Sequence, residues 1–387
     1  MRAALVLALF AAGGPAAADE RRLTLTVSGG AEFNDNIFFS ADDEVDDTIT
    51  RLAGELKFSN RTERWDLLLS ARVVDLIYAE EDDLDAVDQF YNAGAGGWLT
   101  PRLKARVGAG FARDSQPDRD LAETGLLLGT QTRETLRLDA SAEAEVTDIS
   151  MAGISWGFQR ETYDEDQFED YDRHQAGLWF SRRLDRRLPN TQGRVNLGYA
   201  HYDFSSVETD AWTGTLGLVW QWSELWHLAL DGGARYTETA FDSVGGLVPE
   251  RTDSGWGSVG LLLVQYTGER ALLRLSAGHE LGASGGRDGA VERTSAVLDA
   301  SWRLAERSRL ALSAGVYRNQ ADAGELAVRD TDEETVRLSP SLRLALSDDW
   351  GLEASYAWAQ VEDRVADVTR TRNVFMLRLV FAFDVIE

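Results

Sequence analysis

Three of the four histidines, His174, His201 and His279, are the residues best suited to acid–base chemistry. Each falls on the apolar phase of an alternating segment, so an enzyme that modifies lipid from its outer face is one hypothesis. Such an enzyme needs a serine beside the histidine, and the expected strand register gives no convincing serine partner. The chain has no G-x-S-x-G, H-E-x-x-H or P-loop motif, and it contains no Cys. We therefore expect no enzyme and no cofactor.

Charged side chains on the polar phase of the same segments form the second candidate site. Because both signs occur, they predict either a transverse field across a water-filled pore or paired charges that hold a filled interior together. Among the lumen-facing candidates of the last six expected strands, arginines outnumber acids, which favours anionic or sugar-acid solutes. The candidate lumen-lining residues are Arg51, Lys57, Arg72, Lys104, Arg106, Arg137, Glu143, Asp231, Arg235, Arg274, Glu280, Asp299, Arg303, Arg337, Arg343 and Arg378.

Acidic runs gather in the long polar links, over residues 42–47, 80–83, 164–170 and 332–334. They are either solvated loop tips or weak sites for divalent cations next to lipopolysaccharide. No run matches an EF-hand or a glycine-rich nonapeptide repeat, so we expect no dedicated metal site. A basic turn at 182–187 is either solvated or contacts an anionic periplasmic partner.

The elements that carry these residues alternate with a period of two. Over residues 23–33, Leu23, Leu25, Val27, Gly29, Ala31 and Phe33 fall on one face, and the residues between them are mostly polar. The pattern returns in segments of about ten residues, which is typical of transmembrane β-barrels. A charge on the lipid face is costly, so the polar phase must line a lumen. The sequence predicts an all-β fold, a closed antiparallel transmembrane barrel of about 18 strands, with about 16 or 20 as alternatives.

Link lengths alternate independently of hydropathy. Short links such as 60–64, 100–101 and 147–148 follow the even-numbered strands, and long polar links such as 34–47, 79–88 and 113–134 follow the odd-numbered strands. Outer-membrane barrels have short periplasmic turns and long extracellular loops, so we expect both termini in the periplasm. Two irregularities are predicted, namely a bulge where the phase changes within 65–78 and a further strand pair within 113–134, centred on residues 126–128.

Tryptophans cluster at the predicted strand ends next to the short turns. Amphipathic rings at headgroup level form interfacial girdles in membrane barrels. The expected girdle residues are Trp65, Trp98, Trp222, Trp226, Trp302 and Trp350.

The first residues predict export. Arg2, an apolar run over 3–12 and the small residues at 15–18 form a signal peptide over 1–18, which leaves 19–387 as one barrel domain. No later apolar run is long enough for a transmembrane helix. The net charge of −26 argues against nucleic acid as a partner. We expect the cell outer membrane as the location, with membrane lipid, lipopolysaccharide and the barrel assembly machinery as partners.

Residues 31–37 (AEFNDNI) and 46–49 (DDTI) resemble the start of the porin-like outer-membrane β-barrel family associated with exopolysaccharide export systems. In that family an aromatic–polar–Asp–Asn–Ile/Val segment closes the first strand and an Asp-rich segment opens the second. Here Arg51-Leu52-Ala53-Gly54 replaces the usual Pro-Gly, and Asp384–Glu387 extend the last strand beyond its final Phe383. The resemblance implies a pore-like role with polysaccharide export components as partners, and it transfers no catalytic residue.

Three functions therefore remain open from the sequence. The first is a porin-like channel for passive passage of small hydrophilic solutes or an exported polysaccharide. The second is the lipid-modifying enzyme, and the third is a structural or docking barrel with a filled lumen.

Overall fold

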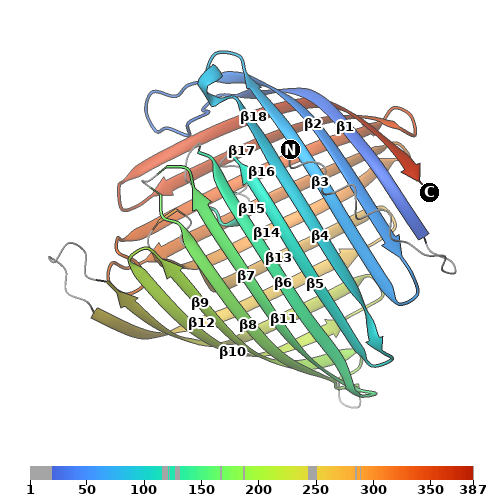
Figure 1. The fold of residues 1–387 in the computed structure, drawn as a ribbon, viewed down its shortest axis with the longest axis vertical. Coiled ribbons are helices and arrows are strands. Elements are labelled where there is room, and N and C mark those ends of the chain that lie inside the picture. Colours follow the sequence, from blue (N-terminus) through green and yellow to red (C-terminus); the bar gives the residue numbers. More distant parts are fainter. Residues whose placement is uncertain are drawn as a thin grey trace, which may run out of the picture.

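The computed structural model describes residues 20–386 apart from 116–120, 122, 127–130, 166–167, 186–187, 243–250, 284–285 and 288. The predicted signal peptide lies outside these residues. The described chain forms a tilted cylinder of antiparallel strands (Figure 1). The strands are β1 Glu20–Asn34, β2 Asp47–Arg61, β3 Trp65–Tyr78, β4 Ala86–Thr100, β5 Leu103–Asp114, β6 Arg133–Thr147, β7 Ser150–Tyr163, β8 Tyr171–Arg183, β9 Thr191–Phe204, β10 Val207–Gln221, β11 Trp226–Phe241, β12 Arg251–Thr267, β13 Ala271–Ala283, β14 Ala290–Ala305, β15 Ser308–Ala321, β16 Thr331–Ala345, β17 Trp350–Asp363 and β18 Val368–Ile386.

The barrel is closed because the first and last strands pair. Each strand pairs with its sequence neighbours, and β1 pairs with β18 from Leu23–Ile386 to Asn34–Val374. The predicted closed antiparallel barrel of 18 strands is therefore confirmed. Both ends of the described chain lie at one rim, as an even strand number requires. A 3₁₀ turn at Asp82–Leu84 lies between β3 and β4, and no helix in the described ranges is long and apolar enough to cross a bilayer.

One contact identifies the inner face of the wall. Residues 121 and 123–126, between β5 and β6, reach β15, which lies half way round the ring from β6. They touch Asn319 of β15 and Thr335 of β16, so these side chains point into the lumen. The strand register then assigns every other residue to the inner or outer face, because side chains alternate.

The outer face carries an apolar band between two aromatic belts. At the extracellular ends of β9–β12, neighbouring ring centroids lie 5.6, 5.8 and 5.2 Å apart along Tyr199, Trp212, Tyr236 and Trp256. At the periplasmic ends the spacings are 5.8, 6.3 and 5.0 Å along Trp220, Trp222, Trp226 and Tyr266. Exposed leucines, including Leu216, Leu218 and Leu230, lie between the belts. This surface matches a bilayer with its two interfaces.

Of the predicted girdle residues, Trp65, Trp222, Trp226, Trp302 and Trp350 lie on the outer face. Trp98 does not. It pairs across the strands with Lys104, whose ammonium nitrogen lies 5.9 Å from the ring centroid. Trp98 therefore points into the lumen, and its assignment to the girdle was wrong.

The bulge predicted in β3 is absent. The β2–β3 register runs without a shift from Ile49–Tyr78 to the periplasmic end. Leu76 and Tyr78 instead point inward, where they pack with Ile37, Ile49 and Val74 in a buried cluster. The phase change in the sequence therefore marks a place where the lumen itself is apolar.

The strand pair predicted within 113–134 is also wrong for the described residues. β5 ends at Asp114 and β6 begins at Arg133, and no strand lies in the described positions between them. Leu126 is buried in the lumen outside any strand, whereas residues 127–128 lie outside the described ranges. The run of leucines at 126–128 suggested the further strand pair, but Leu126 packs inside the lumen from an irregular segment.

Candidate functional site

The lumen wall is the candidate site. The register places every charged lumen-lining candidate on the inner face of its strand. Many of these charges are paired: Arg51 with Glu32 at 2.8 Å, Arg106 with Glu143 at 3.3 Å, Arg378 with Glu353 at 2.9 Å, and Arg194 with Asp231. Such pairs neutralise stretches of the wall and leave the remaining cations to set its local field.

Three unpaired cations form a row across neighbouring strands near the periplasmic end. Arg303 of β14 lies opposite Arg309 of β15, which lies opposite Arg343 of β16. All three are exposed, and none has a carboxylate within ion-pair distance in the described part of the chain. Like charges directly opposite one another destabilise a sheet, so both arginine–arginine contacts oppose folding, although Arg343 also lies opposite Glu353 of β17, which pairs with Arg378. We call Arg303, Arg309 and Arg343 the arginine row.

The other candidates are spread around the wall. Arg137 pairs with Glu123 at 3.2 Å, and Lys57 lies 3.8 Å from Glu55. Arg72 and Arg337 lie over Phe90 and Tyr317, 5.8 and 5.9 Å from the ring centroids. Arg274 lies opposite Asp299, which accepts a hydrogen bond from Ser313 at 2.8 Å, and Glu280 is exposed opposite Arg293 of β14. The structure therefore gathers no single ring of one sign.

Residues 121 and 123–126, the crossing segment, narrow the extracellular half of the lumen. The carbonyl of Gly125 accepts a hydrogen bond from Thr335 Oγ1 at 2.5 Å, and the carbonyl of Thr124 accepts one from Asn319 Nδ2 at 3.0 Å. Leu126 is buried with Val291, Ala321 and Ala327 against β14 and the β15–β16 connection. These contacts join a link from one side of the barrel to the opposite wall.

Gly125 allows the close approach of the crossing segment. Its φ of +70° lies in the left-handed region, and a Cβ there would lie 2.4 Å from Cβ of Tyr317. A side chain at this position would strain the backbone and displace the segment from the wall.

Residues 35–46, the inner loop, support the crossing segment. Phe39 is buried with Leu121, Ala359 and Val361, so the two segments pack together against β17. The guanidinium carbon of Arg372 lies 4.8 Å from the Phe39 ring centroid. The inner loop and the crossing segment thus share one apolar contact inside the lumen.

The NDNI residues hold the inner loop in place. Asp35 accepts hydrogen bonds from the backbone N–H and side-chain amide of Asn373 at 2.6 and 2.7 Å. The amide of Asn36 donates to the carbonyls of Ser40 and Thr371 at 2.8 and 3.0 Å. The motif therefore ties the inner loop to β18 beside the pair that closes the barrel, which is a structural role.

We predict that Asp35→Ala loosens the inner loop and lowers the unfolding temperature. The change removes both acceptors from Asn373, and an unsatisfied buried amide costs about 1–3 kcal/mol. Thermal unfolding in detergent, followed by the gel shift between folded and unfolded barrel, measures it. Asp42→Ala in the same loop is the control because Asp42 is exposed. Equal unfolding temperatures for the two variants would contradict the anchoring role.

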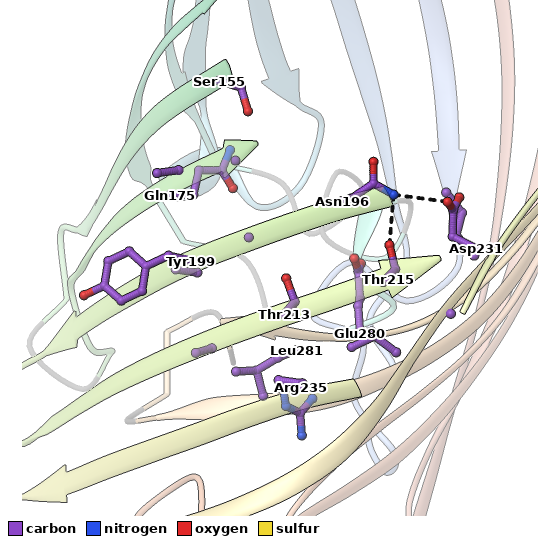
Figure 2. A pocket seen from close by; sticks show the side chains of 18 of the residues that line it. Ser155, Gln175, Asn196, Tyr199, Thr213, Thr215, Asp231, Arg235, Glu280 and Leu281 are labelled. Carbon is purple, nitrogen blue, oxygen red and sulfur yellow. Dashed lines mark hydrogen bonds between the residues drawn. The ribbon is translucent and has the colours of Figure 1, made fainter. Parts of the chain in front are cut away.

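A polar pocket of about 450 Å³ indents the inner wall along β7–β13 (Figure 2). Asn196 Nδ2 donates to Thr215 Oγ1 at 2.9 Å and to Asp231 Oδ1 at 3.2 Å within it. Gln175 and Thr213 line the same pocket. Sequence alternation placed these residues on the polar phase but gave no sign that they form a pocket.

The outward-facing histidines have polar partners but no serine. His174 lies opposite His201, whose Nδ1 is 3.0 Å from Asp210 Oδ1, and His279 Nδ1 is 2.8 Å from Thr294 Oγ1. No serine hydroxyl hydrogen-bonds to these rings among the described residues, and the same residues contain no metal-binding cluster of His, Asp and Glu. That the protein is not an enzyme stays a prediction.

A closed barrel with a polar inner wall and an apolar outer band between aromatic belts is an outer-membrane β-barrel. The protein is accordingly located in the outer membrane.

No family model matches the chain, and no curated protein matches its sequence. Solved structures of similar fold include the alcaligin outer-membrane receptor FauA of Bordetella pertussis, with 14% identity, 95% of this chain and 77% of that chain covered, and a TM-score of 0.46. They also include OccAB4 of Acinetobacter baumannii, with 10% identity, coverages of 94% and 98%, and a TM-score of 0.47. OpdL of Pseudomonas aeruginosa has 10% identity, coverages of 95% and 99%, and a TM-score of 0.44. The likeness is one of fold.

Proposed function

We propose that this protein is a passive channel for small hydrophilic solutes with a preference for anions. The observation that carries the proposal is the arginine row, three exposed cations side by side on the lumen wall. Repulsion between neighbouring guanidinium groups, on the order of 1 kcal/mol per pair in water, is relieved when an anion lies between them. An aqueous lumen is the usual state of a barrel with 16–18 strands.

The solutes are small. The crossing segment and the inner loop occupy part of the extracellular half, which favours small molecules over an exported polysaccharide. The NDNI residues, on which the resemblance to the exopolysaccharide-associated family rests, anchor the inner loop to β18.

Conductance in planar lipid bilayers tests the proposal. We expect discrete single-channel steps, and in a KCl gradient a reversal potential of the sign given by chloride permeating faster than potassium. A properly folded barrel that stays electrically silent would instead support the docking barrel with a filled lumen. A reversal potential of the opposite sign would contradict the anion preference while leaving the channel intact.

A further inference from the structure

The hydrogen-bonded wall is incomplete between β12 and β13. The register of this pair runs from Thr267–Leu272 to Gly260–His279 and stops there in the described part of the chain. Residues 251–259 of β12 continue beside β11 alone, and residues 280–283 of β13 continue beside β14 alone. We call the split between these two segments the seam.

At the seam the extracellular end of β13 overlaps the inner face of the neighbouring strands. The hydroxyl of Tyr202 on β9 donates to the carbonyl of Leu281 on β13 at 3.3 Å, past the three strands between them. Arg235 on β11 forms an ion pair with Glu292 on β14. The extracellular end of the β13–β14 hairpin therefore lies inside the wall formed by β9–β12. We call these two contacts the latch.

The seam extends below the level of the outer-leaflet headgroups. Trp256, 78% exposed, is the β12 member of the extracellular aromatic belt, and such rings lie at the membrane interface. Residues 257–259, also without β13 partners, lie on the periplasmic side of Trp256 and so within the hydrocarbon region. Backbone groups without partners are costly in lipid, so a closed wall is the expected structure of a barrel at this depth.

Cavities lie on both sides of the seam and meet at it. The polar pocket of about 450 Å³ is on the lumen side, and a mainly apolar groove of about 580 Å³ is on the outer side. Both are lined by Asp231, Gly260, Leu261 and His279. The groove continues over outward-facing residues such as Leu230, Leu262 and Val316. The two cavities therefore lie back to back across the end of the β12–β13 ladder.

We propose that the seam is a lateral portal between the lumen and the outer leaflet, and that its ligand is a single-chain amphiphile. The acyl chain lies in the apolar groove, and the polar headgroup lies among Gln175, Asn196 and Thr213 in the pocket. Release of the latch widens the portal, because the latch holds the β13–β14 end across it. This activity is separate from ion conduction along the barrel axis.

Photo-crosslinking tests the portal. The full barrel is reconstituted with one of two lysophosphatidylcholine probes, which carry a diazirine either on the acyl chain or on the headgroup, and adducts are mapped by mass spectrometry. We expect adducts of the acyl-chain probe on the outward-facing Leu230 and Leu262, and adducts of the headgroup probe on the lumen-facing Thr213. In Glu292→Gln the lumen adducts should rise about five- to tenfold, the shift expected when an ion pair that favours the closed state is lost. Glu32→Gln, which disrupts the buried Arg51–Glu32 pair on another part of the wall, should leave them unchanged.

A cross-link gives the complementary result within one protein. The chain has no Cys, and a Cβ at Gly257 would lie 3.2 Å from Glu292 Oε1, so Gly257→Cys with Glu292→Cys can be joined by a short reducible linker. We expect lumen adducts to disappear when the linker is intact and to return on reduction. If the outward-facing residues are labelled and Thr213 stays unlabelled before and after reduction, the portal is refuted. Conductance of the same samples reports independently on the proposed channel.

Discussion

Reversal of the arginine row, by Arg303→Glu, Arg309→Glu and Arg343→Glu together, should convert an anion-preferring channel into a cation-preferring one. The three side chains are exposed and adjacent, so the substitutions replace a local charge of three cations by three anions. Rings and rows of one sign select ions of the other sign. We expect the chloride-to-potassium permeability ratio to fall by about tenfold, as measured from reversal potentials.

Two comparisons make this result specific. The triple Arg→Gln variant should lie between the wild type and the Glu variant. Raising the salt to 1 M, where the Debye length is about 3 Å, should bring all three ratios together. A Glu variant that keeps the wild-type ratio at low salt would show that ions pass elsewhere in the lumen, away from the arginine row.

Removal of the crossing segment, by replacing residues 116–130 with a short Gly/Ser linker, should produce the largest gain in conductance. The segment holds Leu121 and Leu126 in the lumen, far from the strands to which it is connected. An unobstructed barrel of this size encloses a wide aqueous channel, so we expect an increase on the order of two- to fivefold. Single-channel recording measures it, and the gel shift of the folded barrel confirms that the variant still closes.

A point variant tests the same segment without a deletion. Thr335→Val removes the hydroxyl that donates to the Gly125 carbonyl and should give a smaller increase with more frequent transitions between current levels. Thr369→Val is the matched control, since Thr369 is exposed on β18. Unchanged conductance in both the deletion and Thr335→Val would mean that the crossing segment does not limit the current.

The strands were predictable because a barrel wall obeys one rule along its whole length. Alternation such as that of Leu25, Val27 and Gly29 against Thr24 and Thr26 reports a wall with lipid on one side and water on the other. The same rule assigned the lumen-facing arginines. The number of strands could be counted because turn-forming residues separate each alternating segment from the next.

The alternation of apolar and polar residues breaks down where apolar side chains, and not water, fill the lumen. Leu76 and Tyr78 break the alternation because the inner loop brings Ile37 against them. Leu126 packs with Val291 and Ala327, which lie far away in the sequence. Such contacts depend on how the links between strands fold back into the lumen. The alternation of residues within one strand does not predict that folding.

The seam was hidden for a related reason. Residues on both sides of it, such as Trp256 and His279, keep the phase of an ordinary wall strand. Only the displacement of the β13–β14 end toward Tyr202 separates the two strands. The end of the β12–β13 ladder coincides with a tertiary contact to a strand four positions away, which the local sequence does not report.

Because β1 pairs with β18, the barrel can close only after the last strand has been synthesised. β1 cannot complete its pairing until β18 has been made, at the other end of the chain. Until then the edges of β1 and β18 carry backbone N–H and C=O groups that find no hydrogen-bond partner in lipid. A nascent or truncated chain that lacks β18 would form an open sheet with exposed edge strands, which is prone to aggregate with other copies. The hydrogen bonds between Asp35 and Asn373 lie beside the β1–β18 pairing, so they form only when the barrel is closed.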